Sequence, residues 1–551
     1  MKLKNTALNW IIQRIKKYIP LIGLIALLNS LVALAGVALA LISKSVIDAA
    51  TGSNGNRIGA LAAVLFSVLA LELLAHGMST VTNAMASGKI TISLRNHLFS
   101  SLIRKNYKNI SGHHTGDLLN RITSDVDVIV NASVSLIPSI FSMLTKLVSG
   151  IIAMVYLSPA VSLIVIVLGF LVPFIGRFIS KKYKYMHKIV QETEGQARSF
   201  LQESFANIVV IKTFISEAPI LKKLNEYMQK NYRIKIKRSF ISAMMTLSLI
   251  IFFNFGYYAI LIWGAGAISK NIITYGTLTA FLQLITQIRA PLQNISGIVP
   301  QYYSAIASAE RLIDLEKVPQ EPECLKKDKL AEIKNSFNKV SVNNVAFSYD
   351  DEIILKNCSF EFFRGRITAL TGESGSGKST LFKLLLGLYE PIGGSITFND
   401  DIPINASTRG MFAYVPQGNM ILSGTIRENL TLCNPGVSDE EIIKAAKAAV
   451  IYDFISTLPD GFDTVLSERG AGLSEGQVQR LSIARALLFD APILLFDEAT
   501  SALDEATETE LLSNIKKLED KTVLFITHRN TSISVCDDII HVKDKVFTKI
   551  K

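Results

Sequence analysis

The sequence predicts a multidomain chain, in which an all-α transmembrane domain of six helices precedes an α/β domain. Three observations predict this division. Long apolar runs without charge occupy the first part, the net charge changes sign between the parts, and a strand–glycine loop–helix pattern stands in the second part. We expect the transmembrane domain over residues 1–315, a linker over 316–338 and the α/β domain over 339–551.

The transmembrane domain is predicted from apolar runs that are too long for the core of a water-soluble protein. Residues 18–43, 147–176 and 239–269 contain no charged side chain over 26, 30 and 31 residues. About 20 apolar residues are enough for a helix to cross the hydrocarbon core of a bilayer. The six membrane-spanning helices are expected at residues 19–43, 57–80, 133–156, 159–180, 240–264 and 273–299.

The distribution of charge predicts orientation and excludes one class of partner. Residues 1–330 carry 35 Lys and Arg against 16 Asp and Glu, a net charge of +19, whereas residues 331–551 carry 22 against 30, a net charge of −8. The basic excess lies among apolar segments rather than on a soluble face, so nucleic acid is not the expected partner. Six basic residues in 81–132 and thirteen in 181–239 mark these long loops as cytoplasmic. We therefore expect a multi-pass protein of the bacterial cytoplasmic membrane, with its N-terminus and α/β domain in the cytoplasm.

The α/β domain contains a loop with the chemistry of a phosphate-binding site. A strand pattern over 366–371 leads into a glycine-rich loop and then into an apolar-periodic helix. Glycines let backbone N–H groups close around phosphate oxygens, and the helix N-terminus adds positive potential. Lys378 is expected to reach the β- and γ-phosphates of a nucleotide, and the Ser379 hydroxyl to bind Mg²⁺. The expected nucleotide contacts in this loop are Gly372, Glu373, Ser374, Gly375, Ser376, Gly377, Lys378, Ser379 and Thr380.

Two further patterns of buried strands end in residues suited to nucleotide hydrolysis. The strand predicted over 493–496 ends at Asp497 and Glu498. The first acid can hold Mg²⁺ and the second can polarise a water molecule, whereas a helix cap is the alternative role of the pair. The strand predicted over 522–527 delivers His528, for which we favour a contact with the γ-phosphate over a capping role.

Taken in order, these motifs resemble those of ATP-binding cassette (ABC) exporters. The segment from Leu473 to Gln477, Leu-Ser-Glu-Gly-Gln, is similar to the signature motif of that family. The resemblance covers nearly the whole chain. It implies a half-transporter with the ABC exporter fold, in which the α/β domain is a P-loop NTPase with an ABC helical subdomain. It also implies that the chain is an ATPase with ATP and Mg²⁺ as cofactors.

The resemblance assigns roles to further residues near the phosphate loop. Tyr349 lies 23 residues before Gly372 and would stack on adenine, although a core aromatic residue of a strand is the alternative. Gln417 would contact Mg²⁺ and the attacking water. Glu498 would be the general base, and His528 would complete the catalytic group.

In the family that this sequence resembles, the signature motif acts on the nucleotide bound by a second subunit. Ser474, Gly476 and Gln477 would cap the γ-phosphate of ATP that the other subunit holds, and Asp504 lies in a loop that would cross to that subunit. Glu475 stands where the family usually has glycine. A carboxylate near a triphosphate would be repelled, so we expect Glu475 to point away and to leave the Ser474 hydroxyl free.

The first half also resembles the family. Residues 113–126 and 203–214 are similar to two cytoplasmic loops that carry short coupling helices, and residues 468–470 would contact these loops. The tandem pair His113 and His114 has no third metal ligand nearby in the sequence. We therefore interpret the pair as part of a solvated loop.

The resemblance implies that the protein exports a hydrophobic, amphipathic or peptide substrate, such as a small amphipathic molecule or a lipid. Export would be driven by ATP and would proceed by alternating access. One chain holds one phosphate loop and one signature, so a second half-transporter is required as partner. A homodimer is favoured because the nucleotide-site residues are all present, and a heterodimer is the alternative. An importer with the exporter fold and an ATP-gated channel or regulator are the alternative functions.

Charged residues inside the predicted spans are candidates for contact with the substrate. These residues are Glu72, Lys146 and Arg289. An ion pair between Glu72 and Lys146, or a water-filled cavity, would explain them without a substrate. Polar side chains add to the fifth and sixth spans at Asn254, Gln283, Gln287 and Gln293.

Overall fold

The structure is a computed structural model that divides into two compact units. Unit 1 comprises residues 1–100 and 115–316, and unit 2 comprises residues 101–114 and 317–551. Residues 2–52, 55–113, 115–418, 421–432, 434–467, 470, 472–518 and 520–551 are described, some of those inside helices by their backbone alone. His114, Glu468 and Arg469, which the sequence placed in loops, lie outside the described residues.

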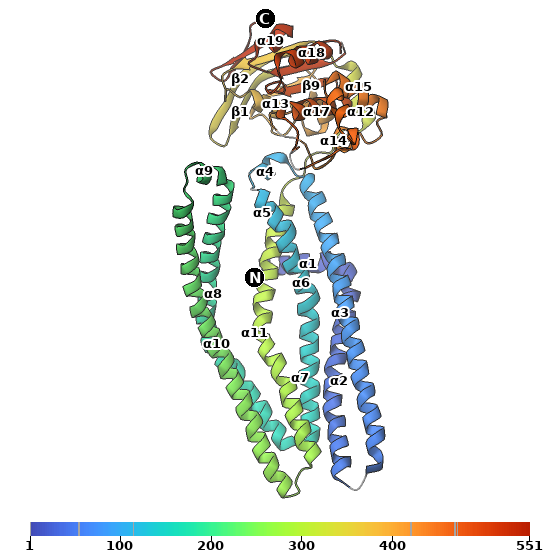
Figure 1. Ribbon diagram of the computed structural model, residues 1–551, viewed down its shortest axis with the longest axis vertical. Coiled ribbons are helices and arrows are strands. Elements are labelled where there is room, and N and C mark those ends of the chain that lie inside the picture. Colours follow the sequence, from blue (N-terminus) through green and yellow to red (C-terminus); the bar gives the residue numbers. More distant parts are fainter. Residues whose placement is uncertain are drawn as a thin grey trace. The chain divides into compact units, whose positions relative to one another are not determined.

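Unit 1 is made of helices, several of them much longer than a membrane is thick (Figure 1). Its α-helices are α1 (Lys2–Ile15), α2 (Ile19–Thr51), α3 (Ile58–Ile103), α5 (Thr115–Asn120), α6 (Val126–Asn131), α7 (Ile137–Leu157), α8 (Pro159–Ala206), α9 (Ile208–Thr213), α10 (Glu217–Ser269) and α11 (Tyr275–Lys317). Two π-helical turns, η3 (Arg121–Asp125) and η4 (Ala132–Leu136), join α5, α6 and α7. At about 1.5 Å per residue, the 48 residues of α8 and the 53 of α10 extend well beyond a hydrocarbon core of about 30 Å.

Four helical segments among the described residues are long and apolar enough to cross a membrane. They are Thr6–Thr51, Ile58–Ile103, Thr115–Leu157 and Glu217–Ser269, and each overlaps one of the predicted spans. The other two predicted spans, 159–180 and 273–299, overlap α8 and α11. The helices expected to span the membrane are therefore present with sufficient length and apolarity, and the count of six spans stays a prediction.

The helices of unit 1 pack through small and branched apolar side chains. Helix α2 lies along α7, and α8 lies along α10, which α9 connects to it at one end (Figure 1). Phe281 and Leu284 of α11 are fully buried against α2 and α7. A second apolar cluster joins α1, α2, α3, α6 and the last turns of α11.

Unit 2 is built on a six-stranded sheet in the order β12-β11-β3-β10-β9-β6, in which the five strands from β11 to β6 are parallel. These strands are β3 (Ile367–Gly372), β6 (Phe412–Val415), β9 (Ile493–Asp497), β10 (Thr522–Ile526), β11 (Asp538–Lys543) and β12 (Val546–Lys549). A four-stranded antiparallel sheet has the order β2-β1-β4-β5. Its strands are β1 (Lys339–Tyr349), β2 (Glu352–Phe363), β4 (Gly393–Phe398) and β5 (Ile402–Pro403). The short strands β7 (Gly424–Thr425) and β8 (Val465–Leu466) form a separate pair.

Alternate residues of the parallel strands enter two cores on opposite faces of the sheet, as the period of two in a strand requires. Leu494 and Phe496 of β9 pack into a core shared with the helices that follow β6 and β9. Ile493 and Leu495 pack into a second core shared with α13 and the antiparallel sheet. The α-helices of unit 2 are α4 (Tyr107–Ser111), α12 (Lys327–Ser336), α13 (Lys378–Leu385), α14 (Ile426–Thr431), α15 (Asp439–Ala448), α16 (Tyr452–Thr457), α17 (Glu475–Leu488), α18 (Glu505–Lys516) and α19 (Asn530–Val535).

Two segments that the sequence analysis interpreted as a loop and a linker contain helices that belong to unit 2. Residues 101–114, from the first cytoplasmic loop, pack with unit 2, and α4 is part of them. The expected linker over 316–338 contains helix α12, whose Ile333 is buried in the second core. Apolar residues at helical spacing in this otherwise polar stretch account for the difference.

Candidate nucleotide site

The phosphate loop connects β3 to α13, as the sequence pattern predicts. Gly375 and Gly377 adopt left-handed backbone angles, with φ of 80° and 100°. A Cβ atom at Gly377 would lie 2.7 Å from a side-chain methyl of Leu355, so the tight approach of the loop to β2 requires glycine. The residues at the tip, Glu373 to Gly375, are exposed, which leaves their backbone groups accessible to a ligand.

Lys378 begins α13 and lies beneath the loop. Its ammonium group donates to the backbone oxygens of Gly372 at 2.8 Å and Glu373 at 2.7 Å. The side chain is buried, and this burial lowers the pKa of Lys378, although the nearby charges of Glu498 and Asp497 act in the opposite direction. The ammonium group thus lies at the base of the loop, where anionic oxygens would replace the backbone carbonyls as its partners.

Ser379 and Asp497 form a pair of oxygen donors next to this lysine. The Ser379 hydroxyl donates to Asp497 Oδ1 at 3.1 Å, and the Tyr414 hydroxyl donates to Oδ2 at 3.2 Å. Burial raises the pKa of Asp497, and these two hydrogen bonds oppose the rise. A buried carboxylate beside a hydroxyl is a suitable partial ligand set for Mg²⁺, which usually takes its remaining ligands from phosphates and water.

Glu498, Gln417 and His528 meet at the ends of three neighbouring parallel strands. Gln417 Nε2 donates to Glu498 Oε2 at 2.6 Å. His528 Nε2 lies 4.0 Å from Glu498 Oε1. Glu498 itself has a left-handed φ of 51°, and its N–H donates to the Ile526 oxygen at 3.0 Å, which holds the backbone that carries the carboxylate.

These side chains share one edge because β3, β10, β9 and β6 are four consecutive parallel strands of one sheet. Loops at the carboxyl ends of such strands form the usual ligand site of α/β folds. Tyr414 is a residue whose role the sequence analysis did not identify. A hydroxyl-bearing aromatic residue on β6, the strand next to β9, is the signal that could have identified it.

The signature segment lies at the N-terminus of α17, whereas the phosphate loop lies at the N-terminus of α13. Ser474 is the N-cap: its Oγ accepts from the Gln477 N–H at 3.3 Å, and Gln477 Oε1 accepts from the Ser474 N–H at 2.8 Å. The Ser474 hydroxyl therefore uses an acceptor site in the cap and keeps its proton for another partner. Glu475 is exposed in the single chain, and its direction relative to a nucleotide of the partner subunit stays a prediction.

The loop before α18 packs against the start of α17. A Cβ atom at Gly476 would lie 2.9 Å from the Ala502 oxygen, so only glycine allows this approach. Asp504 is the N-cap of α18, where its carboxylate accepts from the Thr507 N–H at 3.0 Å. These contacts join the signature and the expected crossing loop within one subunit.

Tyr349 lies at the end of β1 in a cluster of aromatic rings. Its ring centroid is 4.9 Å from that of Phe347 and 5.2 Å from that of Tyr389, both edge to face. Lys383 of α13 places its ammonium group 5.7 Å from the Tyr349 ring centroid. Thr380 is buried in the same helix. The site thus places the aromatic residue expected to bind adenine beside the helix that starts at the phosphate loop.

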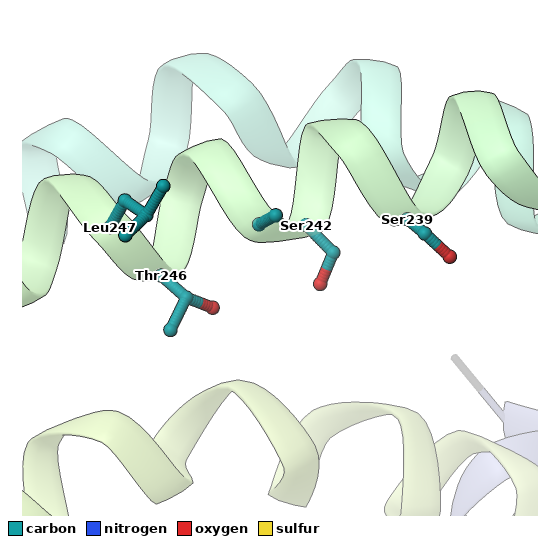
Figure 2. Close-up of a pocket in the computed structure, with 5 residues that line it drawn as sticks. Ser239, Ser242, Thr246 and Leu247 are labelled. Carbon is teal, nitrogen blue, oxygen red and sulfur yellow. The ribbon is translucent and has the colours of Figure 1, made fainter.

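Unit 1 carries a shallow pocket of about 490 Å³ on α10, lined by Ser239, Ser242, Ala243, Thr246 and Leu247. Figure 2 shows the hydroxyl groups of Ser239, Ser242 and Thr246 along one side of this helix. Helical spacing places Asn254 on the same side about two turns further on, where its Oδ1 accepts from Arg289 at 3.3 Å.

The other polar candidates of the membrane part lie apart from this pocket. Glu72 and Lys146 are both half-buried, and no ion pair joins them among the described residues. Gln287 Nε2 donates to the Gly36 oxygen at 2.7 Å, and Gln283 is exposed. The side chain of Gln293 lies outside the described residues.

Comparisons with known proteins agree with this architecture. Family profiles for the ABC transporter transmembrane region and for the ABC transporter match residues 22–292 and 355–501. The chain is 30% identical over 457 residues to an ATP-dependent lipid A-core flippase of Syntrophus aciditrophicus, a match that covers 82% of this chain and 76% of the relative. It is 31% identical over 533 residues to the uncharacterized ABC transporter ATP-binding protein YknV of Bacillus subtilis, covering 95% of this chain and 87% of the relative.

Similarity extends to a solved structure and to a further relative. The structure of a bacterial Atm1-family ABC exporter with ATP bound matches with a TM-score of 0.80 at 25% identity, over 97% of this chain and 94% of that one. A fatty acid ABC transporter ATP-binding/permease protein of Mycobacterium bovis is 29% identical over 88% of this chain and 76% of its own length. This chain belongs to the ABC transporters and is an exporter half-transporter, in which a membrane-spanning helical region precedes an ATPase domain coupled to transport.

Proposed function

We propose that two copies of this chain form a homodimer in the bacterial cytoplasmic membrane, and that the dimer exports an amphipathic, lipid-like molecule by alternating access. One observation carries the proposal. The phosphate loop, Ser379 with Asp497, and the Gln417–Glu498–His528 group converge at one sheet edge. Phosphoryl transfer needs mainly positioning and charge stabilisation, and this set supplies both.

Each residue then has a defined part in hydrolysis. Lys378 would bind the β- and γ-phosphate oxygens in place of the carbonyls that it contacts in the loop. Ser379 and Asp497 would hold Mg²⁺, which neutralises charge that develops on the phosphates. Glu498 would take a proton from the attacking water. Gln417, which donates a hydrogen bond of 2.6 Å to Glu498, would orient the carboxylate and the water. His528 would donate to a γ-phosphate oxygen.

A second copy is needed because each chain supplies one phosphate loop and one signature helix. The Ser474 cap and the first turn of α17 present a helix N-terminus that suits the γ-phosphate held by the partner subunit. The tip that joins α8 to α10 supports the dimer as well. Its apolar side chains are more than two-thirds exposed in the single chain, as expected of a surface that another subunit covers. They are Phe205, Val209, Phe214 and Ile215.

The substrate proposal combines the membrane part with the names of the relatives. Relatives are named as a lipid A-core flippase and as a fatty acid transporter. The hydroxyl-lined side of α10 continues to Asn254, which binds Arg289, and this guanidinium has no ion pair with a carboxylate among the described residues. A cation inside the membrane whose hydrogen-bond partner is a neutral amide is suited to bind the anionic headgroup of a lipid. We therefore infer an amphiphile with a negatively charged head.

The test uses the full chain in proteoliposomes. We expect Mg²⁺-dependent release of phosphate from ATP, its stimulation by amphiphiles such as fatty acids or phospholipids, and a dimeric mass in a native-like bilayer. Inside-out vesicles should accumulate the amphiphile upon addition of ATP, since the N-terminus and the ATPase domain face the cytoplasm. A monomer that fails to hydrolyse ATP in the bilayer would overturn the proposal, and accumulation in right-side-out vesicles would indicate import.

A further inference from the structure

The two strands that carry the proposed catalytic residues Glu498 and His528 are paired only up to the point where these residues begin. Strands β9 and β10 pair up to Asp497 and Ile526, and the Glu498 N–H then donates to the Ile526 oxygen. Beyond this hydrogen bond Glu498 continues into the loop 499–504, whereas His528 leads into α19. The ladder of the sheet therefore does not by itself fix the 4.0 Å between His528 Nε2 and Glu498 Oε1.

Arg529, the residue after His528, connects the two chains beyond the end of the ladder. Its Nη2 donates to the Ser501 oxygen and its Nη1 donates to the Leu503 oxygen, both at 2.8 Å. These carbonyls belong to the loop that starts at Glu498, whose own oxygen accepts from the Ser501 N–H at 3.1 Å. One guanidinium group therefore joins the chain of His528 to the chain of Glu498.

The guanidinium group is anchored by Glu508 of α18, whose side chain is 1% exposed. Glu508 Oε2 accepts from Arg529 Nη1 at 2.8 Å and from Thr531 Oγ1 at 2.9 Å. Its Oε1 accepts from Thr500 at 3.0 Å and from Ser532 at 2.5 Å. Burial acts to raise the pKa of Glu508, but these four hydrogen bonds outweigh it and lower the pKa from its ordinary value. Glu508 is therefore an ionised carboxylate at neutral pH, and a charge-assisted hydrogen bond holds Arg529 in place.

The loop 499–504 is a firm support for Arg529 because the signature helix also binds it. Gln479 of α17 is 9% exposed, and its Oε1 accepts from the Ala502 N–H at 3.1 Å. Its Nε2 donates to Ser501 Oγ at 3.0 Å. Since Gln479 holds the loop independently of Arg529, the arginine can transmit the position of the loop to the residue that precedes it.

His528 is itself exposed, but the residues on either side of it are held. Thr527 is 4% exposed, and its N–H donates to the Leu370 oxygen of β3 at 3.3 Å. The Thr527 hydroxyl accepts from the Arg529 N–H at 3.1 Å. With both neighbours held, the imidazole moves mainly by rotation about its own side-chain bonds.

We propose that Arg529 is a positioning residue of the ATPase reaction, which is anchored by Glu508 and sets the spacing between His528 and Glu498. The proposal rests on the proposed function, in which His528 binds a γ-phosphate oxygen and Glu498 acts on the attacking water. Both groups act on the same phosphoryl group, so a displacement of about 1 Å between them lowers the rate of the chemical step. Binding of the nucleotide stays intact, because Lys378 and the phosphate loop are unchanged.

The first test is Arg529→Lys in the full chain, reconstituted in proteoliposomes. Lysine keeps a positive charge for Glu508 but lacks the planar fork that reaches two carbonyl oxygens at once. We expect kcat for ATP hydrolysis to fall about 10- to 100-fold, with KM for Mg²⁺–ATP changed by about threefold or less. Arg364→Lys is the matched control and should retain the wild-type rate. The Arg364 guanidinium also donates to two backbone oxygens, but it precedes β3, at the opposite end of the strands.

A double-variant cycle separates the positioning of His528 from a general structural effect. If Arg529 acts through His528, Arg529→Lys should lower the rate by about threefold or less in the His528→Ala background. Single-turnover phosphate release resolves the slow rates of this background. Full additivity of the two losses would overturn the inference, because the arginine would then act on something other than the histidine.

Hydrogen–deuterium exchange of the nucleotide-free protein gives a second measurement, which does not depend on hydrolysis. Arg529→Lys should speed exchange several-fold in a peptide that covers residues 499–504, and it should leave a peptide that covers residues 372–380 as in the wild type. Glu508→Gln keeps the shape of the anchor and removes its charge, so it replaces the first variant if that one fails to fold. This change should lower kcat and speed exchange of the loop by about threefold or more.

The outcomes distinguish this inference from the proposed function. Wild-type kcat and wild-type exchange of the loop in a folded variant would overturn the inference alone. A wild-type protein that binds ATP without hydrolysing it would overturn the proposed function, and the inference would fall with it, whatever the exchange of the loop.

Discussion

Replacement of Glu498 by glutamine is the most direct test of the proposed catalytic site. The change removes one negative charge and keeps the shape of the side chain. Glu498 has a φ of 51°, and its N–H is fixed by the Ile526 oxygen at 3.0 Å. Glutamine meets the same backbone conformation at the same strain, so we expect the variant to fold like the wild type. Gln417 can keep its contact, since the new amide still offers an oxygen to its Nε2.

The expected magnitude follows from the loss of one proton acceptor. A positioned general base contributes about 10²- to 10⁴-fold to a rate, and a neutral amide cannot take the proton of the attacking water. We therefore expect kcat for ATP hydrolysis to fall about 10²- to 10³-fold. The phosphate contacts of Lys378 and the loop remain, and one repulsive charge is lost, so the affinity for Mg²⁺–ATP should stay equal or increase.

The assay is phosphate release from proteoliposomes at saturating Mg²⁺–ATP, together with equilibrium binding of a fluorescent ATP analogue. Glu505→Gln is the matched control, because Glu505 is an exposed glutamate in the first turn of α18. This control should hydrolyse ATP at the rate of the wild type. A kcat of Glu498→Gln within tenfold of the wild type would refute the assignment of Glu498 as general base.

Three further predictions concern other parts of the chain. Gly476→Ala should reduce ATPase activity more than about tenfold, because the added Cβ would lie 2.9 Å from the Ala502 oxygen. Gly436→Ala is the control and should leave the activity unchanged, because a Cβ there would meet only one side-chain atom, at 3.9 Å. Asp497→Asn should abolish hydrolysis yet raise the melting temperature of the nucleotide-free protein at pH 7, since burial raises the pKa of Asp497 and disfavours its ionised form in the folded state. That gain is full above the raised pKa and disappears as the pH falls towards about 4, the ordinary pKa of aspartate, which thermal unfolding at several pH values would reveal. Arg289→Leu should remove stimulation of the ATPase by fatty acids and spare that by uncharged amphiphiles of equal chain length; equal losses for both would contradict an anion contact.

The nucleotide site could be predicted from sequence largely because its parts are local. The phosphate loop needs glycines at fixed spacing between one strand and one helix. The bounds of β3 and the first residue of α13 lie within one or two residues of the predicted strand and helix. Asp497 follows a run of buried apolar residues that forms a fully buried strand. Such patterns report burial and backbone freedom directly, without knowledge of distant contacts.

Contacts between distant residues could not be read from the sequence in the same way. The backbone hydrogen bond from Asn106 to Pro319 joins residues that are more than 200 positions apart, and it depends on backbone groups rather than on side chains. Tyr389 lies in an ordinary apolar stretch after α13, and only the fold shows that its ring meets Tyr349. Glu321 likewise has several basic residues as candidate partners in the sequence, and only the folded structure shows that Arg409 pairs with it.

Two glutamates on either side of the boundary between the units each make side-chain contacts within their own unit. Within unit 1, Glu316 accepts from Trp10 Nε1 at 2.9 Å and from Arg14 at 2.9 Å, and it lies 3.1 Å from His97 Nε2. Within unit 2, Glu321 is held by the α4 backbone and by an arginine.

Two carboxylates five residues apart thus fix the chain to different units, with the boundary at the peptide after Glu316. Both ends of the segment from Glu316 to Glu321 are therefore held by side chains and backbone groups that lie far away in the sequence, and no local pattern of residues reveals such contacts.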